Sequence, residues 1–212
     1  MDGQSSASRS AWPLWFALAT AAWTLALIVV GGAFYPGYDQ AGQFISELGA
    51  VDAPTYPWAG WLGLIPLGVL QCLFCLTALR SAPKSGLALA GFIALAGYGL
   101  GAIGGGVFPC DAASGCMPAE PSVSQMLHNA IGGGGYLIAL LGLALTASAA
   151  LGWKGGRWLG MLGLAAAALA FAALFAIEAL PQLRGALQRT AEAAFLIWFV
   201  ACGWWLSRPR AR

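Results

Sequence analysis

Residues 123–151 read VSQMLHNAIGGGGYLIALLGLALTASAAL, and His128 carries the only acidic or basic side chain in this stretch. A bilayer hydrocarbon core about 30 Å thick requires roughly 20 helical residues for each crossing. The stretch is longer than that, and most of its side chains are apolar. It therefore predicts a helix that spans a membrane.

The rest of the chain has the same character. Of its 212 residues, 59% are hydrophobic and only 8% are charged, and the mean hydropathy is +0.75. Long apolar runs have no stable place in water, which excludes a soluble domain. Six runs are long enough to cross a bilayer, and they lie near residues 12–34, 58–79, 85–107, 123–151, 158–177 and 186–206. The sequence thus predicts an all-α, polytopic membrane protein, with a single transmembrane domain of six helices over residues 1–212.

Charged residues sort to opposite ends of these runs. Eight of the ten Lys and Arg residues fall at one set of ends, and seven of the eight Asp and Glu residues fall at the other. Short loops rich in Lys and Arg stay on the cytoplasmic side during insertion. We therefore expect both termini, with tails over residues 1–10 and 207–212, to be cytoplasmic in a bacterial inner membrane. The basic residues are dispersed over several loops, so the net charge of +2 does not indicate nucleic-acid binding.

The first of three outward loops, residues 35–57, reads YPGYDQAGQFISELGAVDAPTYP. Its middle has helical spacing, with Phe44 and Leu48 on one side. This spacing predicts a short helix that lies in the membrane interface as an anchor. Alternatively, Ser46 and Glu47 turn inward, cap the helix bundle and line a cavity. The spacing alone does not decide between the two.

The second outward loop, FPCDAASGCMPAEPS, contains Cys110 and Cys116 on the side of the membrane that we expect to be oxidising. A disulfide would tighten this small loop, which has little core of its own. Metal binding is the weaker alternative, because two thiols and one distant histidine fall short of a usual zinc ligand set. We therefore expect a disulfide and no metal.

His128, the only histidine of the chain, lies just inside the fourth predicted helix. It is followed by four consecutive glycines, residues 132–135, while the third predicted helix has Gly97, Gly101 and Gly105 at a spacing of four. Glycine faces either let two helices pack closely or leave room for a ligand. Close packing is the commoner outcome, and both interpretations remain open.

The third outward turn brings further charges to the same depth. Glu178 ends the fifth predicted helix, and Arg189 and Glu192, three residues apart, can pair on one face of the sixth. Ionisable groups in or near hydrocarbon usually face the bundle interior and take partners. The predicted polar cluster consists of Glu47, Asp111, His128, Glu178, Arg189 and Glu192. Such a cluster forms a salt-bridge network, a ligand site or a path for ions or protons.

Several short motifs together have a family likeness: YPG, then ISELGA, then FPCD, the histidine that opens helix four, the glutamate that ends helix five, and LQR at the start of helix six. This set resembles the bacterial six-helix membrane proteins of domain-of-unknown-function family 998 over about residues 12–206. The resemblance implies six helices and no assigned reaction. The positions that match its pattern are Ser46, Glu47, Cys110, Asp111, His128, Glu178, Gln188 and Arg189. The ISEL segment is also distantly similar to the Frag/DRAM/Sfk group, some of whose members are tied to lipid-anchor remodelling, but likeness of fold does not carry function.

These observations predict an outward polar pocket that binds, and in one version processes, a lipid or amphipathic small molecule. The candidate catalytic residues are His128, Glu47, Glu178 and Ser46. The candidate ligand-binding residues are Asp111, Gln188, Arg189 and Glu192. The sequence leaves catalysis undecided and implies no cofactor. An enzyme requires His128 within hydrogen-bond reach of Glu47 or Glu178. One alternative is an accessory subunit that binds a second copy or another membrane protein. A small transporter is a less favoured alternative.

Overall fold

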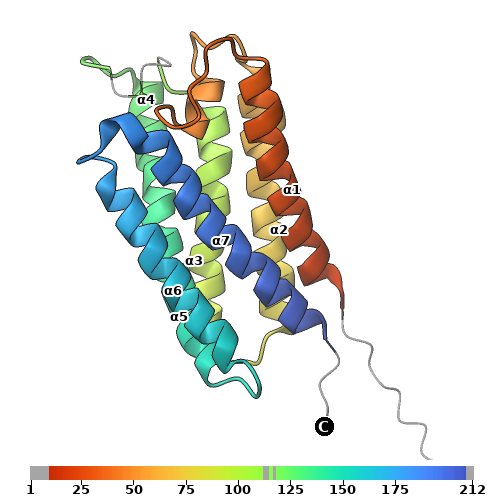
Figure 1. Ribbon diagram of the computed structural model, residues 1–212. Coiled ribbons are helices and arrows are strands. Elements are labelled where there is room, and N and C mark those ends of the chain that lie inside the picture. Colours follow the sequence, from red (N-terminus) through yellow and green to blue (C-terminus); the bar gives the residue numbers. More distant parts are fainter. Residues whose placement is uncertain (1–9, 112–114, 117, 209–212) are drawn as a thin grey trace, which may run out of the picture.

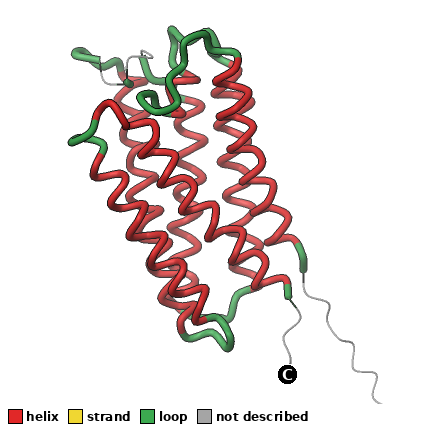
Figure 2. Tube along the Cα trace, in the orientation of Figure 1, coloured by secondary structure: helices red, strands yellow, loops and turns green. Residues whose placement is uncertain are grey.

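Six long apolar helices run side by side in the computed structural model, which describes residues 10–111, 115–116 and 118–208 (Figures 1 and 2). Each is long and apolar enough to cross a membrane. The prediction of an all-α fold with six helices of membrane-spanning length is thereby confirmed. The predicted cytoplasmic tails fall mostly on residues 1–9 and 209–212, outside the described part of the chain.

Three of the six spans are built from more than one helical element. The first, third and fifth spans are the α-helices α1 (Trp12–Ala33), α3 (Gly86–Val107) and α6 (Arg157–Ala176). The second combines the π-helix η2 (Ala59–Leu64) with α2 (Ile65–Ser81). The fourth runs through α4 (Val123–Leu127), the π-helix η3 (His128–Gly133) and α5 (Gly134–Leu151), and the sixth joins the 3₁₀ turn η4 (Pro181–Leu183) to α7 (Arg184–Ser207).

The two ends of the bundle differ in charge. α1 begins and α7 ends at the lower end in Figure 1, beside the short loops that join α2 to α3 and α5 to α6. We call this the basic end, and its described basic residues are Arg80, Lys84, Lys154, Arg157 and Arg208. The opposite, acidic end carries the loops over residues 34–58 and 177–183 and the described parts of the second loop, residues 108–111, 115–116 and 118–122. Exposed tryptophans lie near both ends, with Trp12 and Trp15 at the start of α1 and Trp61 near the start of the second span, as expected for side chains at a membrane interface.

Small residues bring neighbouring helices into backbone contact. A Cβ atom added at Gly99 of α3 would lie 2.7 Å from the carbonyl oxygen of Gly68 in α2. One added at Gly101 of α3 would lie 3.0 Å from the Cα atom of Gly135 in α5. Because no hydrophobic effect drives helices together inside a lipid bilayer, such close van der Waals packing is a main source of helix association.

The first long loop does not lie flat beside the bundle. It contains the short 3₁₀ helix η1 (Ile45–Gly49), which is tucked against the helix ends, so that Ile45, Glu47 and Leu48 are buried. Of the two arrangements that the spacing allowed, the inward-turned one is present. The loop therefore closes the acidic end of the bundle.

The close approach of α2 and α3 makes a stability prediction. Gly68→Ala would push a methyl group into the carbonyl oxygen of Gly99 and the backbone nitrogen of Ile103. Overpacking of this kind typically costs about 1–3 kcal/mol, so we expect a clear drop in the thermal midpoint of the detergent-solubilised protein. Gly134→Ala is the matched control, because a Cβ atom there meets nothing within 4 Å. Equal midpoints for both variants would show that the α2–α3 contact is looser than described.

Candidate functional site

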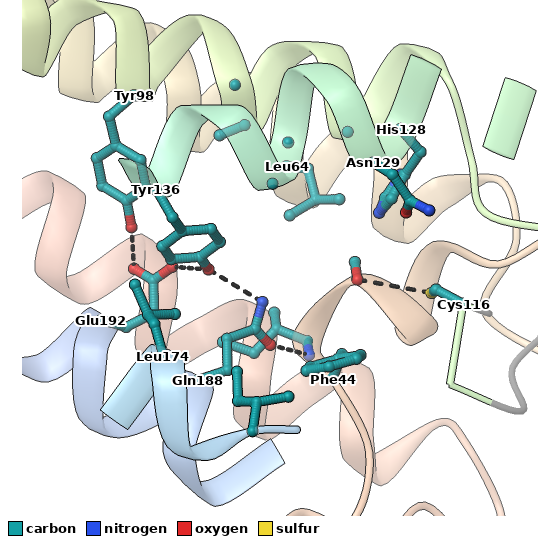
Figure 3. Close-up of a pocket in the computed structure, with 18 of the residues that line it drawn as sticks. Phe44, Leu64, Tyr98, Cys116, His128, Asn129, Tyr136, Leu174, Gln188 and Glu192 are labelled. Carbon is teal, nitrogen blue, oxygen red and sulfur yellow. Dashed lines mark hydrogen bonds between the residues drawn. The ribbon is translucent and has the colours of Figure 1, made fainter. Parts of the chain in front are cut away.

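A cavity of about 360 Å³ lies in the acidic half of the bundle (Figure 3). Residues from η1, α2, α3, η3, α5, the end of α6 and α7 line it. Apolar side chains such as Leu64 and Leu174 form much of the wall, and polar groups gather at two ends. Ligand sites in proteins commonly have this size and composition.

The inner polar end is centred on Glu192, which is buried. Tyr98 donates a hydrogen bond of 2.6 Å to Oε2 of Glu192, and Tyr136 donates one of 2.5 Å to Oε1. Nε2 of Gln188 donates to the Tyr136 hydroxyl at 2.9 Å, and the backbone N–H of Ile45 donates to Oε1 of Gln188 at 2.7 Å. A hydrogen-bonded chain therefore runs from η1 to a carboxylate inside the bundle.

Gln71 of α2 also lines this part of the cavity and is fully buried. Neither its amide oxygen nor its amide nitrogen makes a hydrogen bond of acceptable geometry within the described residues, although the amide lies beside the Tyr98 hydroxyl. A buried amide without partners costs about 1–3 kcal/mol. Its position on the wall makes it available to a molecule in the cavity.

The outer polar end contains His128, Ser46 and Cys116 (Figure 3). Nδ1 of His128 lies 2.8 Å from the carbonyl oxygen of Phe108, and Oγ of Ser46 lies 3.7 Å from Sγ of Cys116. His128 begins the π-helix η3, a rare conformation that is often found at functional sites. The histidine is thus held by the backbone, and no carboxylate bonds to it among the described residues.

The predicted disulfide is present. The sulfur atoms of Cys110 and Cys116 lie 2.09 Å apart. Both sulfurs and a ring nitrogen of His128 fall within 4.8 Å of one another. Because the two sulfurs are bonded to each other, neither is a free thiolate that could coordinate zinc.

The four consecutive glycines, residues 132–135, do not all have the same surroundings: one packs against a neighbouring helix, and others face open space. Gly135 packs against Gly101 of α3, whereas a Cβ atom at Gly133 or Gly134 would meet nothing within 4 Å. Gly133 lines the cavity, and Gly134 does not. The exposed lining residues mark an opening between two spans: Asn129, Gly133 and Leu137 lie on the fourth span, and Glu178 lies just after α6. Both interpretations of the glycines are therefore realised, each by a different glycine.

Arg189 is not part of the cavity lining and holds the first loop. It donates to the carbonyl oxygens of Gln43 at 2.8 Å and Gly185 at 2.9 Å, and to the hydroxyl of Tyr38 at 2.7 Å. Burial raises the pKa of Tyr38 to about 12, although the Arg189 guanidinium opposes the shift, so the phenol keeps its proton and donates to the carbonyl oxygen of Phe44. The anticipated pairing of Arg189 with Glu192 does not occur, because each side chain has other partners.

Glu47 is fully buried and also belongs to the loop closure. Its carboxylate accepts hydrogen bonds from the Phe44 backbone N–H and the Gln43 amide. Arg184, which donates to the carbonyl oxygen of Gly42, lies 3.7 Å from it. The carboxylate is therefore satisfied by its own loop and α7.

Asp111 lies in the second loop, outside the cavity lining. Its carboxylate accepts hydrogen bonds from the hydroxyl and the backbone N–H of Ser122, which lowers the pKa of Asp111 below its usual value. Its own backbone N–H donates to Gln125, whose amide reaches the carbonyl oxygen of Cys116. These contacts tie the disulfide loop to the start of α4.

The predicted catalytic and ligand-binding residues thus separate into two groups. Ser46, His128, Glu178, Gln188 and Glu192 line the cavity. Glu47, Asp111 and Arg189 hold the loops above it. Sequence reasoning missed the tyrosines that bind Glu192 and missed Gln71, although a lone glutamine in an apolar span was a visible signal.

Buried aromatic rings close the cavity toward the basic end. Phe74 lies one helical turn beyond Gln71, and Phe195 lies one turn beyond Glu192. Trp198 and Phe199 follow, and the rings of Phe74 and Phe199 stack at 4.4 Å. Beyond this layer the described bundle buries no charged side chain, and the buried hydroxyls of Thr20 and Thr146 bond to carbonyl oxygens of their own helices.

A helical bundle with six membrane-length apolar spans and a largely apolar cavity defines a polytopic membrane protein. The chain belongs to the family described as "Protein of unknown function (DUF998)", whose model matches residues 18–205. No curated protein and no solved structure matches it.

The position of Arg189 makes a prediction that separates loop closure from ligand binding. Arg189→Met removes three hydrogen bonds from a charged donor, and each such bond contributes about 1.5–3 kcal/mol. We expect a lower thermal midpoint in detergent, whereas the exposed control Arg157→Met should match the wild type. An unchanged midpoint together with loss of a bound small molecule would instead assign Arg189 to ligand binding.

Proposed function

We propose that this protein is a bacterial inner-membrane protein whose outward-facing cavity binds a lipid or amphipathic small molecule. The single observation that carries the proposal is the cavity itself. It combines a largely apolar wall, a buried amide at Gln71 that makes no hydrogen bond of acceptable geometry with the described residues, and an opening between two membrane-length spans. A molecule with an apolar chain and a polar head can enter such an opening sideways from the bilayer and satisfy both surfaces.

The orientation rests on charge. The basic end carries short loops with Arg80, Lys84, Lys154 and Arg157, which favours a cytoplasmic location for that end. Both termini would then be cytoplasmic, and the cavity and the disulfide would face outward. An oxidising compartment on that side fits the bonded cysteine pair.

Binding is supported better than catalysis or transport. A hydrolytic mechanism with Ser46 as nucleophile needs a base bonded to it, but Nδ1 of His128 contacts the carbonyl oxygen of Phe108, and Ser46 contacts Cys116. A transporter needs a polar route onward, and the aromatic layer lies across that route in the described bundle.

An accessory subunit is the second candidate. A groove between α1 and α7 is lined almost entirely by apolar side chains, including Leu18, Ala21, Ile197 and Ala201. A helix of a second copy or of another membrane protein could pack there through the small residues. This candidate predicts a stable protein complex and no requirement for a ligand in the cavity.

The proposed orientation predicts a labelling pattern in intact cells. A membrane-impermeant maleimide should label Glu120→Cys, in the second loop of the acidic end, without permeabilisation. It should label Lys154→Cys, in a loop of the basic end, only after permeabilisation. Both positions are exposed, so the difference reports sidedness. The reverse pattern would contradict the orientation.

Ligand binding is tested by native mass spectrometry of protein gently extracted from its own membrane. The wild type and Gly134→Leu should carry a discrete small-molecule adduct, and Gly133→Leu should lose most of it, because Leu at position 133 fills the opening. The variants are matched, since a Cβ atom at either glycine is free of neighbours and only Gly133 lines the cavity. Equal adducts in all three proteins, or none in any, would contradict the proposal, and a second protein mass would favour the accessory subunit.

A further inference from the structure

The charges that line the cavity are unusual for a lipid site. Its lining includes the carboxylates of Glu178, at the opening, and Glu192, at the inner end. No lysine or arginine lines it among the described residues. The two nearby arginines, Arg184 and Arg189, bond to loop carbonyl oxygens, and Arg184 also pairs with Glu47. His128, the one basic side chain in the described lining, is bonded through Nδ1 to the carbonyl oxygen of Phe108. An anionic head group would therefore meet two carboxylates and no lysine or arginine.

The hydrogen-bond directions around Glu192 are determined by one backbone group. The N–H of Ile45 can only donate, so the atom of Gln188 that it contacts is the amide oxygen. The Gln188 amide nitrogen must then donate to the Tyr136 hydroxyl, whose own proton is left to donate to Oε1 of Glu192. Glu192 is thus held as an acceptor at this oxygen.

The second oxygen of Glu192 has the same role. It accepts from the Tyr98 hydroxyl, so phenol donors occupy both carboxylate oxygens. Hydrogen bonds from the two phenols favour the charged form of this carboxylate, whereas burial opposes it, and a buried anion is normally paired with a cation. The described residues place no lysine or arginine against Glu192. A cation delivered by a ligand would complete the pair.

The walls near Glu192 also suit a cation. The rings of Tyr98 and Tyr136 lie 5.5 Å apart and both line the cavity, and aromatic faces attract ammonium groups. The Gln71 amide oxygen, which lacks a hydrogen-bond donor, can accept from an ammonium N–H. Leu64 and Leu174 also line the cavity, and their side chains suit an apolar chain.

We infer that the cavity selects amphipathic amines, with the ammonium group against Glu192 and the apolar chain directed to the opening between the spans. This inference rests on the proposed binding function and adds the chemical class of the ligand. It separates amines from fatty acids and neutral alcohols of the same length.

The test compares three probes with one chain length: decylamine, decanol and decanoate. Binding is measured to the protein in lipid nanodiscs, with empty nanodiscs as the reference for partition into the bilayer. The wild type should bind decylamine at least about tenfold more tightly than decanol, since charge-assisted hydrogen bonds are roughly twice as strong as neutral ones. Decanoate should bind most weakly. A wild type that binds decanol or decanoate as well as decylamine overturns the inference, whatever the variants do.

The variants assign the preference to one carboxylate. Glu192→Gln should lose most of the preference for decylamine over decanol. Glu120→Gln, the same substitution at an exposed acid of the second loop outside the cavity lining, should retain it because that side chain does not reach a molecule in the cavity. If Glu192→Gln folds and retains the full preference, the assignment to Glu192 is wrong.

The result also separates this inference from the function on which it rests. If decanol and decylamine bind equally and Gly133→Leu blocks both, the cavity is a ligand site without charge selection. If no probe binds beyond the empty-nanodisc reference and Gly133→Leu changes nothing, the proposed binding function itself fails.

Discussion

The hydrogen bond from the backbone N–H of Ile45 to Gln188 joins the first loop to the last helix, and much of the acidic end depends on it. It holds η1 over the bundle and orients the Gln188 amide, which in turn orients Tyr136 toward Glu192. Because no water competes inside a bilayer, each of these groups must find its partner within the protein or in a ligand. Loop closure and the hydrogen bonding of Glu192 are therefore coupled through the Gln188 side chain.

Glycine has two opposite effects in this fold, and the local neighbour decides which applies. Where a glycine faces another backbone, as Gly101 faces Gly135, the helices approach closely and the bundle is stabilised. Where it faces no neighbour, as at Gly133, the missing side chain leaves space on the cavity wall. Two glycines only two residues apart on one span thus help both to build the bundle and to open it.

The sequence predicted the six long helices because length and apolar composition alone set that property, and it predicted the disulfide because Cys110 and Cys116 are near neighbours in a small loop. It could not show which of the predicted polar residues line the cavity and which hold the loops above it. Arg189 and Glu192 lie three residues apart, yet Arg189 bonds to residues of the first loop and Glu192 to tyrosines on α3 and α5. Those partners come from other parts of the chain, and helical spacing within one segment carries no information about them.

Glu47 and Glu192 are both buried acids, but they differ in whether the protein supplies a positive charge beside them. This difference distinguishes a structural acid from a candidate binding residue. Glu47 has two hydrogen-bond donors from its own loop and a guanidinium at 3.7 Å, so its charge is compensated within the protein. Glu192 has two neutral phenols and faces open space. Phenols direct hydrogen bonds but bring no positive charge, and in a low-dielectric interior that difference is large. The acid that the protein leaves uncompensated is the one that lines the cavity, which is the arrangement a site for a cationic ligand requires.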